Sequence, residues 1–199
     1  FDSLKFRSIG PAYTSGRIAD FAINPQNISE YYVGVASGNI WKTSNSSTTW
    51  KPVFEHYGSY SIGALKMDPN NSNIVWAGSG ENNHQRALGY VDGVYKTTDG
   101  GDTWKNMGLV NSSQIGMIAI DPRNSNIVFV AAEGSVWGPG GDRGLYKTLD
   151  GGITWKKVLE ISENTGVNNV IIDPQNYDVM YATSEQRRRH VFTKIGGGP

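Results

Sequence analysis

Three glutamates recur at one position of a repeated pattern, and their spacing is the first indication of chemistry in this chain. Glu81, Glu133 and Glu185 follow the proline that closes a preceding apolar strand by 12, 11 and 11 residues, and arginine follows each of them. Two carboxylates that flank a cleft can cleave a glycosidic bond, whereas a carboxylate beside a guanidinium group forms an ion pair. Three interpretations stay open: the glutamates pair with neighbouring arginines or cap loop N–H groups, they form a polar ring that binds a sugar, a peptide or a cation, or Glu81 and Glu133 form a catalytic pair.

The segments that carry these glutamates supply most of the other candidate residues. Residues 79–92, 133–143 and 185–190 read as long, irregular connections on one side of a repeated scaffold, where such scaffolds carry function. Trp137 is predicted to be exposed, so that it can stack on a sugar ring or anchor a partner. The arginine run 187–189 could hold a phosphate or a carboxylate, although pairing with acidic loops is the more common outcome. The candidate binding residues are Arg17, Glu81, Asn82, Asn83, His84, Arg86, Glu133, Trp137, Arg143, Glu185 and Arg187.

No metal site and no cofactor are predicted. The chain has no cysteine, which excludes disulfides and thiol catalysis. Its three histidines, His56, His84 and His190, do not have the spacing of metal ligands. His84, in the segment 79–92, is the best functional candidate among them.

The charge balance and the hydropathy pattern exclude two classes of partner. Eighteen basic and 18 acidic residues give a formal net charge of zero, so there is no general attraction to nucleic acid or to anionic lipid. No apolar run approaches the roughly 20 residues that a membrane helix requires. We therefore predict neither nucleic-acid binding nor a membrane span.

The elements that must position these residues repeat along the chain. Eight-residue segments at 43–50, 97–104 and 148–155 each end in Thr-Trp and follow an aromatic-Lys-Thr strand end. Upstream of each lies an apolar strand that ends in Asn-Pro or Asp-Pro, then a polar turn and a further strand. Four short antiparallel strands in about 50 residues are typical of a propeller blade.

The eight-residue segments themselves are predicted to be structural hairpins. An Asp or Asn side chain can accept backbone N–H bonds in the turn, glycine tolerates positive φ, and the tryptophan can fill the space between blades. A catalytic or calcium-binding aspartate is the lesser alternative. The residues to which we assign this structural role are Asn45, Trp50, Asp99, Gly101, Trp104, Asp150, Gly152 and Trp155.

The predicted fold is an all-β propeller of four-stranded antiparallel blades, with three full blades and a partial fourth, as part of a larger propeller. The expected blades are residues 18–54, 62–109, 115–161 and, in part, 167–199, and the N-terminal segment 1–17 could supply a ring-closing strand. Because closed propellers have roughly 4 to 8 blades, we expect the remainder of the ring to come from the same or another chain.

The hairpin pattern resembles the Asp-box of the BNR-repeat propellers, a group that includes sialidases, xyloglucan hydrolases, sortilin-type (VPS10) receptors and a photosystem assembly factor. The strings Ser15-Gly16-Arg17-Ile18, Trp137-Gly138-Pro139 and Gln186-Arg187-Arg188-Arg189 resemble one subgroup in particular. It comprises the secreted, sortilin-like or "glycosyl hydrolase"-labelled propellers of Bacteroidetes-like environmental bacteria. This resemblance implies an extracytoplasmic place, secreted or at the bacterial cell surface.

Two departures from the family pattern bear on activity. The Arg-Ile-Pro motif of the sialidases is interrupted here, where the nearest string is Arg7-Ser8-Ile9-Gly10-Pro11. Xyloglucan hydrolases of this class carry a catalytic aspartate soon after the second strand of the first blade, and residues 35–40 contain no carboxylate. Neither hydrolytic centre is carried over.

The expected function is that of a cell-surface or secreted propeller that binds a glycan, a peptide or a protein through its long loops. We expect no enzyme activity on this interpretation. One alternative is a glycoside hydrolase that acts on a polysaccharide with loop carboxylates. The other is a structural subunit of an envelope complex.

Overall fold

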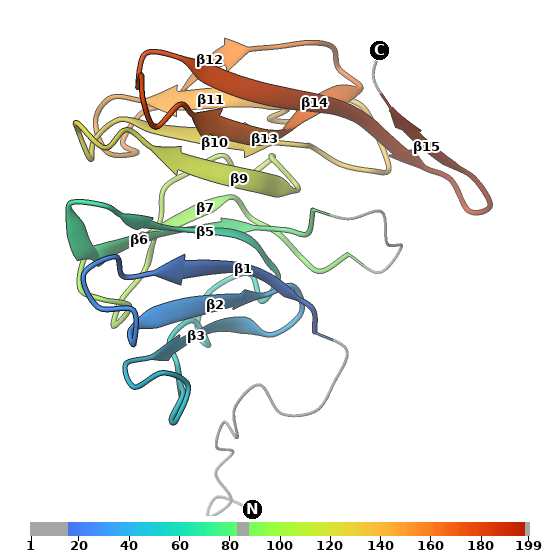
Figure 1. Cartoon of the computed structure of the whole chain (residues 1–199). Coiled ribbons are helices and arrows are strands. Elements are labelled where there is room, and N and C mark those ends of the chain that lie inside the picture. The colour runs from blue at the N-terminus through green and yellow to red at the C-terminus, as the bar shows by residue number, and fades with distance from the viewer. Residues whose placement is uncertain (1–15, 83–87, 198–199) are drawn as a thin grey trace, which may run out of the picture.

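The computed structural model describes residues 16–82 and 88–197, which form 15 β-strands and no helix (Figure 1). None of the described segments is a helix long and apolar enough to cross a membrane. Predictions that fall on residues 1–15, 83–87 and 198–199 lie outside the described residues, and these include the ring-closing role of the N-terminal segment.

The strands form four antiparallel sheets in which each strand pairs with its neighbour in sequence. The first sheet contains β1 (Ile18–Ile23), β2 (Tyr31–Val35), β3 (Asn39–Thr43) and β4 (Lys51–Pro52). The second contains β5 (Ile62–Asp68), β6 (Asn71–Ser79), β7 (Val94–Thr97) and β8 (Lys105–Asn106). The third contains β9 (Ile115–Ile120), β10 (Val128–Ala132), β11 (Gly144–Thr148) and β12 (Lys156–Leu159). The fourth contains β13 (Thr165–Ile172), β14 (Met180–Arg189) and β15 (Lys194–Gly197).

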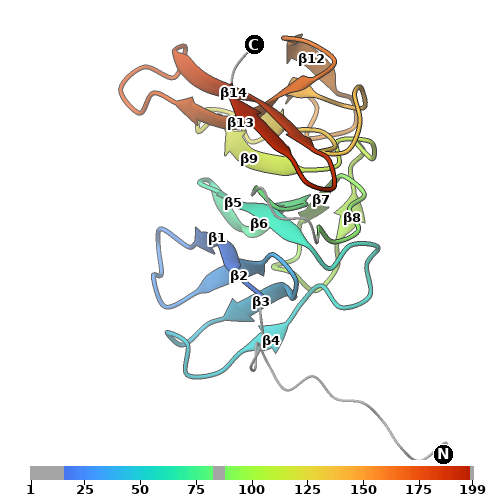
Figure 2. The same ribbon diagram turned by 90° about the vertical axis from the view of Figure 1, so that its right-hand side faces the viewer.

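The four sheets pack face to face in series, and the strands that open them, β1, β5, β9 and β13, contact one another in that order (Figures 1 and 2). The hydrophobic cores lie between sheets, as in a propeller. Trp104 of the second sheet packs with Tyr32 and Phe54 of the first, and Trp155 of the third sheet meets Trp76 of the second edge to face at 6.1 Å. The predicted β-propeller class is confirmed.

The repeated hairpins are closed by their own side chains. Asp99 Oδ1 accepts a bond from the Thr103 N–H at 2.9 Å, and Asp150 Oδ1 accepts one from the Thr154 N–H at 2.9 Å. Hydrogen bonds from Thr103 hold the pKa of Asp99 at about 2. Asn45 accepts the equivalent bond from the Thr49 N–H at 2.9 Å. Each aspartate or asparagine thus satisfies a backbone donor within its own turn.

Trp50 differs in its place from the other two hairpin tryptophans. It is half-buried and packs edge to face on Tyr31 at 5.7 Å, on the face of the first sheet that points away from the second. The expected position between two sheets is therefore not found for Trp50 among the described residues.

The connections segregate to two faces of the molecule. Each repeated hairpin bonds to the turn between the first two strands of its own sheet or to the start of the second strand, for example through Gly151 N–H to Asn126 O at 3.0 Å and Gly100 N–H to Asn73 O of β6 at 2.9 Å. We call this the hairpin face. The opposite ends of the strands bear the longer connections, which bond to one another, as in Asp142 N–H to Asn111 O at 3.0 Å, and we call it the loop face.

Candidate functional site

Four charged residues, one from each sheet region, meet on the loop face. Arg17 immediately precedes β1, Glu81 follows β6, Glu133 follows β10, and Arg187 lies in β14. The Arg17 guanidinium forms an ion pair with the Glu81 carboxylate, and Arg187 Nη2 lies 2.5 Å from Glu133 Oε2. Arg187 Nη2 also donates to the Glu81 carbonyl oxygen at 3.4 Å. We call these four residues the charge cluster; it ties the four sheets together and is formally neutral.

Most of the charge cluster is closed to solvent. The side chains of Glu81, Glu133 and Arg187 are 2, 4 and 3% exposed, and only Arg17 is half exposed, at 49%. Burial raises the pKa of Glu133 to about 8, because desolvation and the neighbouring Glu185 carboxylate outweigh the attraction of Arg187. A carboxylate this deeply buried does not reach a polysaccharide on the surface. Of the three interpretations of the glutamates, this geometry matches the one in which they pair with neighbouring arginines, since Glu81 pairs with Arg17 and Glu133 with Arg187.

The buried Gln114 bonds to the backbone of two members of the charge cluster. The Glu81 N–H donates to Gln114 Oε1, and the Glu133 N–H donates to the Gln114 carbonyl oxygen at 2.8 Å. Gln114 gives no signal in the sequence, because a single glutamine just before an apolar strand carries no pattern.

A hollow of about 260 Å³ opens beside Gln114 on the loop face. Its walls come from residues 88–91 of the second sheet's connection and 135–137 of the third sheet's, with Ser113 and Gln114 between them. Two aromatic side chains border it, Tyr90 at 63% and Trp137 at 53% exposure. Exposed aromatic faces together with amide and hydroxyl groups suit a ring that carries hydroxyl groups, since the rings can stack and the polar groups can bond.

The sequence predicts Trp137 as a binding residue but does not predict Tyr90. Tyr90 lies within the irregular segment 79–92, but tyrosine is common enough that its type alone gave no signal. What identifies Tyr90 is its place across the hollow from a second connection, and that place depends on the packing of two sheets.

Arginines fix the loop that carries Trp137. Arg143 donates to the carbonyl oxygens of Glu133 and Ser135 and, at 2.7 Å, to that of Gly138. From the fourth sheet, Arg188 Nη1 donates to the Ser135 carbonyl at 3.3 Å. The backbone N–H of Arg189 donates to Val136 O at 2.8 Å. The loop is thus bound from two sheets at once.

Residues 185–189 differ from the irregular connection that their sequence predicts. They are not an irregular loop but the end of the long strand β14, which pairs with β15 from Gln186 to Arg189. Alternation along this strand explains the different contacts of the three arginines. The three arginines do not form an open anion-binding site. They contact carboxylate, amide and carbonyl groups of the protein, such as Asn164 Oδ1 for Arg188.

The remaining candidates do not converge on the hollow as a group. Glu185 accepts a bond from Asn168 Nδ2 at 3.3 Å, and Asn82 is exposed next to Glu81. Asn83, His84 and Arg86 lie outside the described residues.

His56 and His190 are exposed, and the described part of the chain contains no group of three or more His, Asp or Glu side chains that could hold a metal ion.

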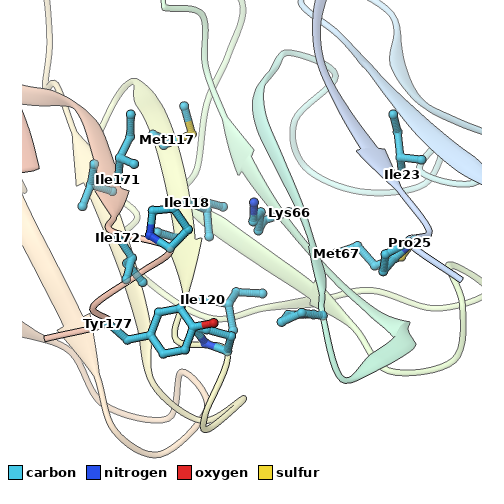
Figure 3. A pocket seen from close by; sticks show the side chains of 15 residues that line it. Ile23, Pro25, Lys66, Met67, Met117, Ile118, Ile120, Ile171, Ile172 and Tyr177 are labelled. Atoms are coloured by element: carbon cyan, nitrogen blue, oxygen red, sulfur yellow. The ribbon is translucent and has the colours of Figure 1, made fainter. Parts of the chain in front are cut away.

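A second hollow, of about 530 Å³, follows the proline ends of β1, β5, β9 and β13 (Figure 3). Its wall is almost entirely apolar, with Ile23, Met67 and Ile120 among the lining residues and Lys66 and Tyr177 as the polar exceptions. It offers few groups that could orient a polar ligand, so we place the candidate site at the hollow between Tyr90 and Trp137.

The fold and the site define a propeller with an aromatic-bordered hollow on its loop face. Comparison with known proteins shows which proteins resemble this chain. No family model matches the chain. It is 31% identical over 163 residues to the xyloglucanase Xgh74A of Acetivibrio thermocellus, which covers 74% of this chain and 18% of the relative. It is 25% identical over 177 residues to a xyloglucanase of Hypocrea jecorina, with 81% and 20% covered. The homologues therefore include glycoside hydrolase propellers, and this chain spans about a fifth of the length of these relatives.

Solved structures support the fold. The GH74 xyloglucanase of Xanthomonas campestris matches with a TM-score of 0.62 at 17% identity, over 85% of this chain and 27% of that one. A structure described as YCF48 bound to D1 peptide matches with a TM-score of 0.54 at 15% identity, over 82% and 46%. Since an enzyme and a peptide-bound protein share this architecture, the fold does not fix the function.

Proposed function

We propose that this chain contributes a sugar-binding site to a polysaccharide-active propeller, and that glycoside hydrolysis of a neutral glucan of the xyloglucan class is the activity it serves. The observation that carries the proposal is the hollow between Tyr90 and Trp137, with Gln114 and Ser113 between the aromatic side chains. The similarity to two xyloglucanases supports the choice of polysaccharide.

The chemistry of the hollow favours an uncharged ligand. Among the described residues, its lining contains aromatic, aliphatic, amide and hydroxyl side chains and no Asp, Glu, Lys or Arg. The charged groups beneath it are already engaged, because Arg187 pairs with Glu133 and Arg143 binds three loop carbonyls. A neutral pyranose can stack on tryptophan or tyrosine and bond to the half-buried Ser113 hydroxyl without displacing an ion pair.

Glu81 and Glu133 act in this proposal as positioning residues. Both are buried and paired, so they hold the ends of β6 and β10 and the loops that follow rather than touching the sugar. The burial of these carboxylates favours a second candidate, a propeller that binds the polysaccharide without cleaving it. An extracytoplasmic place is part of both proposals, since a polysaccharide is too large to enter a cell intact.

A polysaccharide panel separates the two candidates. The chain is run through gels that contain xyloglucan, an unbranched β-glucan, xylan or polygalacturonate, and reducing ends are measured in parallel. We expect retardation by xyloglucan and none by polygalacturonate. Release of reducing ends identifies the hydrolase, and retardation without release identifies the binding protein. No retardation by any neutral polysaccharide contradicts the proposal.

The variant Glu81→Gln decides the role of that carboxylate. If hydrolysis is observed, we expect it to persist in Glu81→Gln at a rate within a few-fold of the parent. Complete loss of cleavage with retained gel retardation would instead make Glu81 catalytic.

A further inference from the structure

Ser113 lies at the centre of a strained three-residue turn. The Gln114 N–H donates to the Ser112 carbonyl oxygen at 2.6 Å, and Ser113 between them has a φ of 57°. A hydrogen bond that spans a single residue of positive φ defines the classic γ-turn, which is rare and strained. The chain therefore carries a local cost in free energy at this position.

The repeated architecture does not require this turn. Ser113 stands nine residues before Pro122, the strand-closing proline of the third sheet, and the same position in the second and fourth sheets holds Tyr60 and Thr165. Neither Tyr60 nor Thr165 has a positive φ. Of these three equivalent positions, only the one between the second and third sheets, where the hollow lies, adopts the strained turn.

Contacts on both sides hold the turn in place. The Ser112 carbonyl oxygen also accepts a bond from the Gly134 N–H at 3.0 Å. Gln114 accepts bonds from two backbone N–H groups of the charge cluster. Ser112 and Gln114 are 0 and 4% exposed, so the residues on either side of Ser113 are buried and fixed. A strained conformation persists where its surroundings determine it in this way, and such residues cluster at functional sites.

The turn presents Ser113 to the hollow between Tyr90 and Trp137. Ser113 is half-buried and lines that hollow. Its hydroxyl forms no hydrogen bond with any of the described residues. A serine hydroxyl can donate one hydrogen bond and accept two, so this group is available to a ligand in the hollow.

We infer that the γ-turn holds the Ser113 hydroxyl toward a sugar bound in the hollow, and that Ser113 is a specificity-determining residue. The inference rests on the proposed function, because the ligand is the sugar that stacks on Trp137 or Tyr90. The aromatic rings contact the faces of a pyranose, whereas Ser113 bonds to a hydroxyl group at its edge. A site that bonds a hydroxyl of its ligand discriminates against an analogue that lacks it.

Stability and binding should therefore respond in opposite directions to one substitution. Ser113→Gly removes both the Cβ atom that strains the turn and the hydroxyl that bonds the sugar. We expect the midpoint of thermal unfolding to rise by about 2 °C. The affinity for a xyloglucan oligosaccharide, measured by calorimetry, should fall about fivefold. Ser113→Ala keeps the Cβ atom, so it should show the same loss of affinity without the rise in the midpoint.

Ser46→Gly is the matched control. Ser46 has a φ of 54° and lies on the hairpin face, at the position that Gly100 occupies in the second hairpin. Its exposed hydroxyl bonds to that of Ser29 at 3.0 Å. Because glycine relieves a positive φ here too, we expect a similar rise in the unfolding midpoint, but with the affinity of the parent chain.

Two results would overturn the inference and leave the proposed function in place. One is equal affinity in the parent and Ser113→Gly while Trp137→Ala binds more weakly. The other is an unfolding midpoint that does not rise in Ser113→Gly, since the turn would then carry no strain. If the parent itself does not bind the oligosaccharide, the proposed function fails and the inference fails with it.

Discussion

Arg187 of the fourth sheet lies 2.5 Å from the Glu133 carboxylate of the third, and both side chains are buried. A buried pair of this kind adds little to stability compared with an apolar pair, but the loss of one partner leaves an uncompensated charge. The pair therefore makes the junction between these two sheets sensitive to single substitutions.

Substitution of Arg187 by methionine is expected to lower the free energy of unfolding by about 3 kcal/mol at alkaline pH. The loss should be smaller at acid pH, where Glu133 binds a proton and no bare charge remains. Urea unfolding of both proteins at two pH values measures the difference. The control Lys51→Met removes an ion pair whose side chains are 67 and 68% exposed, so a change below about 1 kcal/mol is expected. Equal losses in the two variants would contradict the assignment.

The stability of the parent chain should depend on pH through Glu133. Burial raises the pKa of Glu133 in the folded protein from its usual 4.5 to about 8. Between these values the folded state binds more protons than the unfolded state, so this contribution is complete below the lower value and is lost as the pH rises toward the upper one.

Glu133→Gln removes this titration. Relative to that variant, the parent should lose up to about 1.4 kcal/mol of unfolding free energy per pH unit in the window between the two pKa values. Glu160→Gln, at a side chain that is 65% exposed, should follow the parent. Parallel pH profiles for the parent and Glu133→Gln would show that the carboxylate does not titrate in this range.

Close approach of β9 and β13 requires glycine at position 116. A Cβ atom there would lie 2.2 Å from the Asn168 carbonyl oxygen and 2.7 Å from the Glu133 carboxylate. Gly116→Ala should therefore destabilise the chain by about 1 to 3 kcal/mol in thermal unfolding. A Cβ atom at Gly138 would meet nothing within 4 Å, so Gly138→Ala should stay within about 0.5 kcal/mol. If the two alanine variants melt together, the packing described at this junction is wrong.

The propeller fold could be predicted from the sequence, whereas the hollow between Tyr90 and Trp137 could not. The strand order followed from the repeat, because strand-closing prolines and Thr-Trp hairpins fix the register of each unit regardless of its neighbours. The pairing of Glu133 with Arg187 could be anticipated only as one of three interpretations, since it joins residues of different sheets. Gln114 and Tyr90 gave no signal, because their importance comes from the way two connections meet. The extension of β14 through Arg189 was missed, since its polar residues read as a loop until β15 pairs with them.

The most direct test of the proposed function is the affinity of the chain for a xyloglucan oligosaccharide, measured by calorimetry for the parent, Trp137→Ala and Tyr177→Ala. Tyr177, 38% exposed in the turn between β13 and β14 on the hairpin face, is the matched aromatic control. Loss of one stacking contact of about 1.4 kcal/mol corresponds to about tenfold weaker binding. We expect that loss for Trp137→Ala and parental affinity for Tyr177→Ala; equal affinity in all three proteins would contradict a sugar site at the hollow.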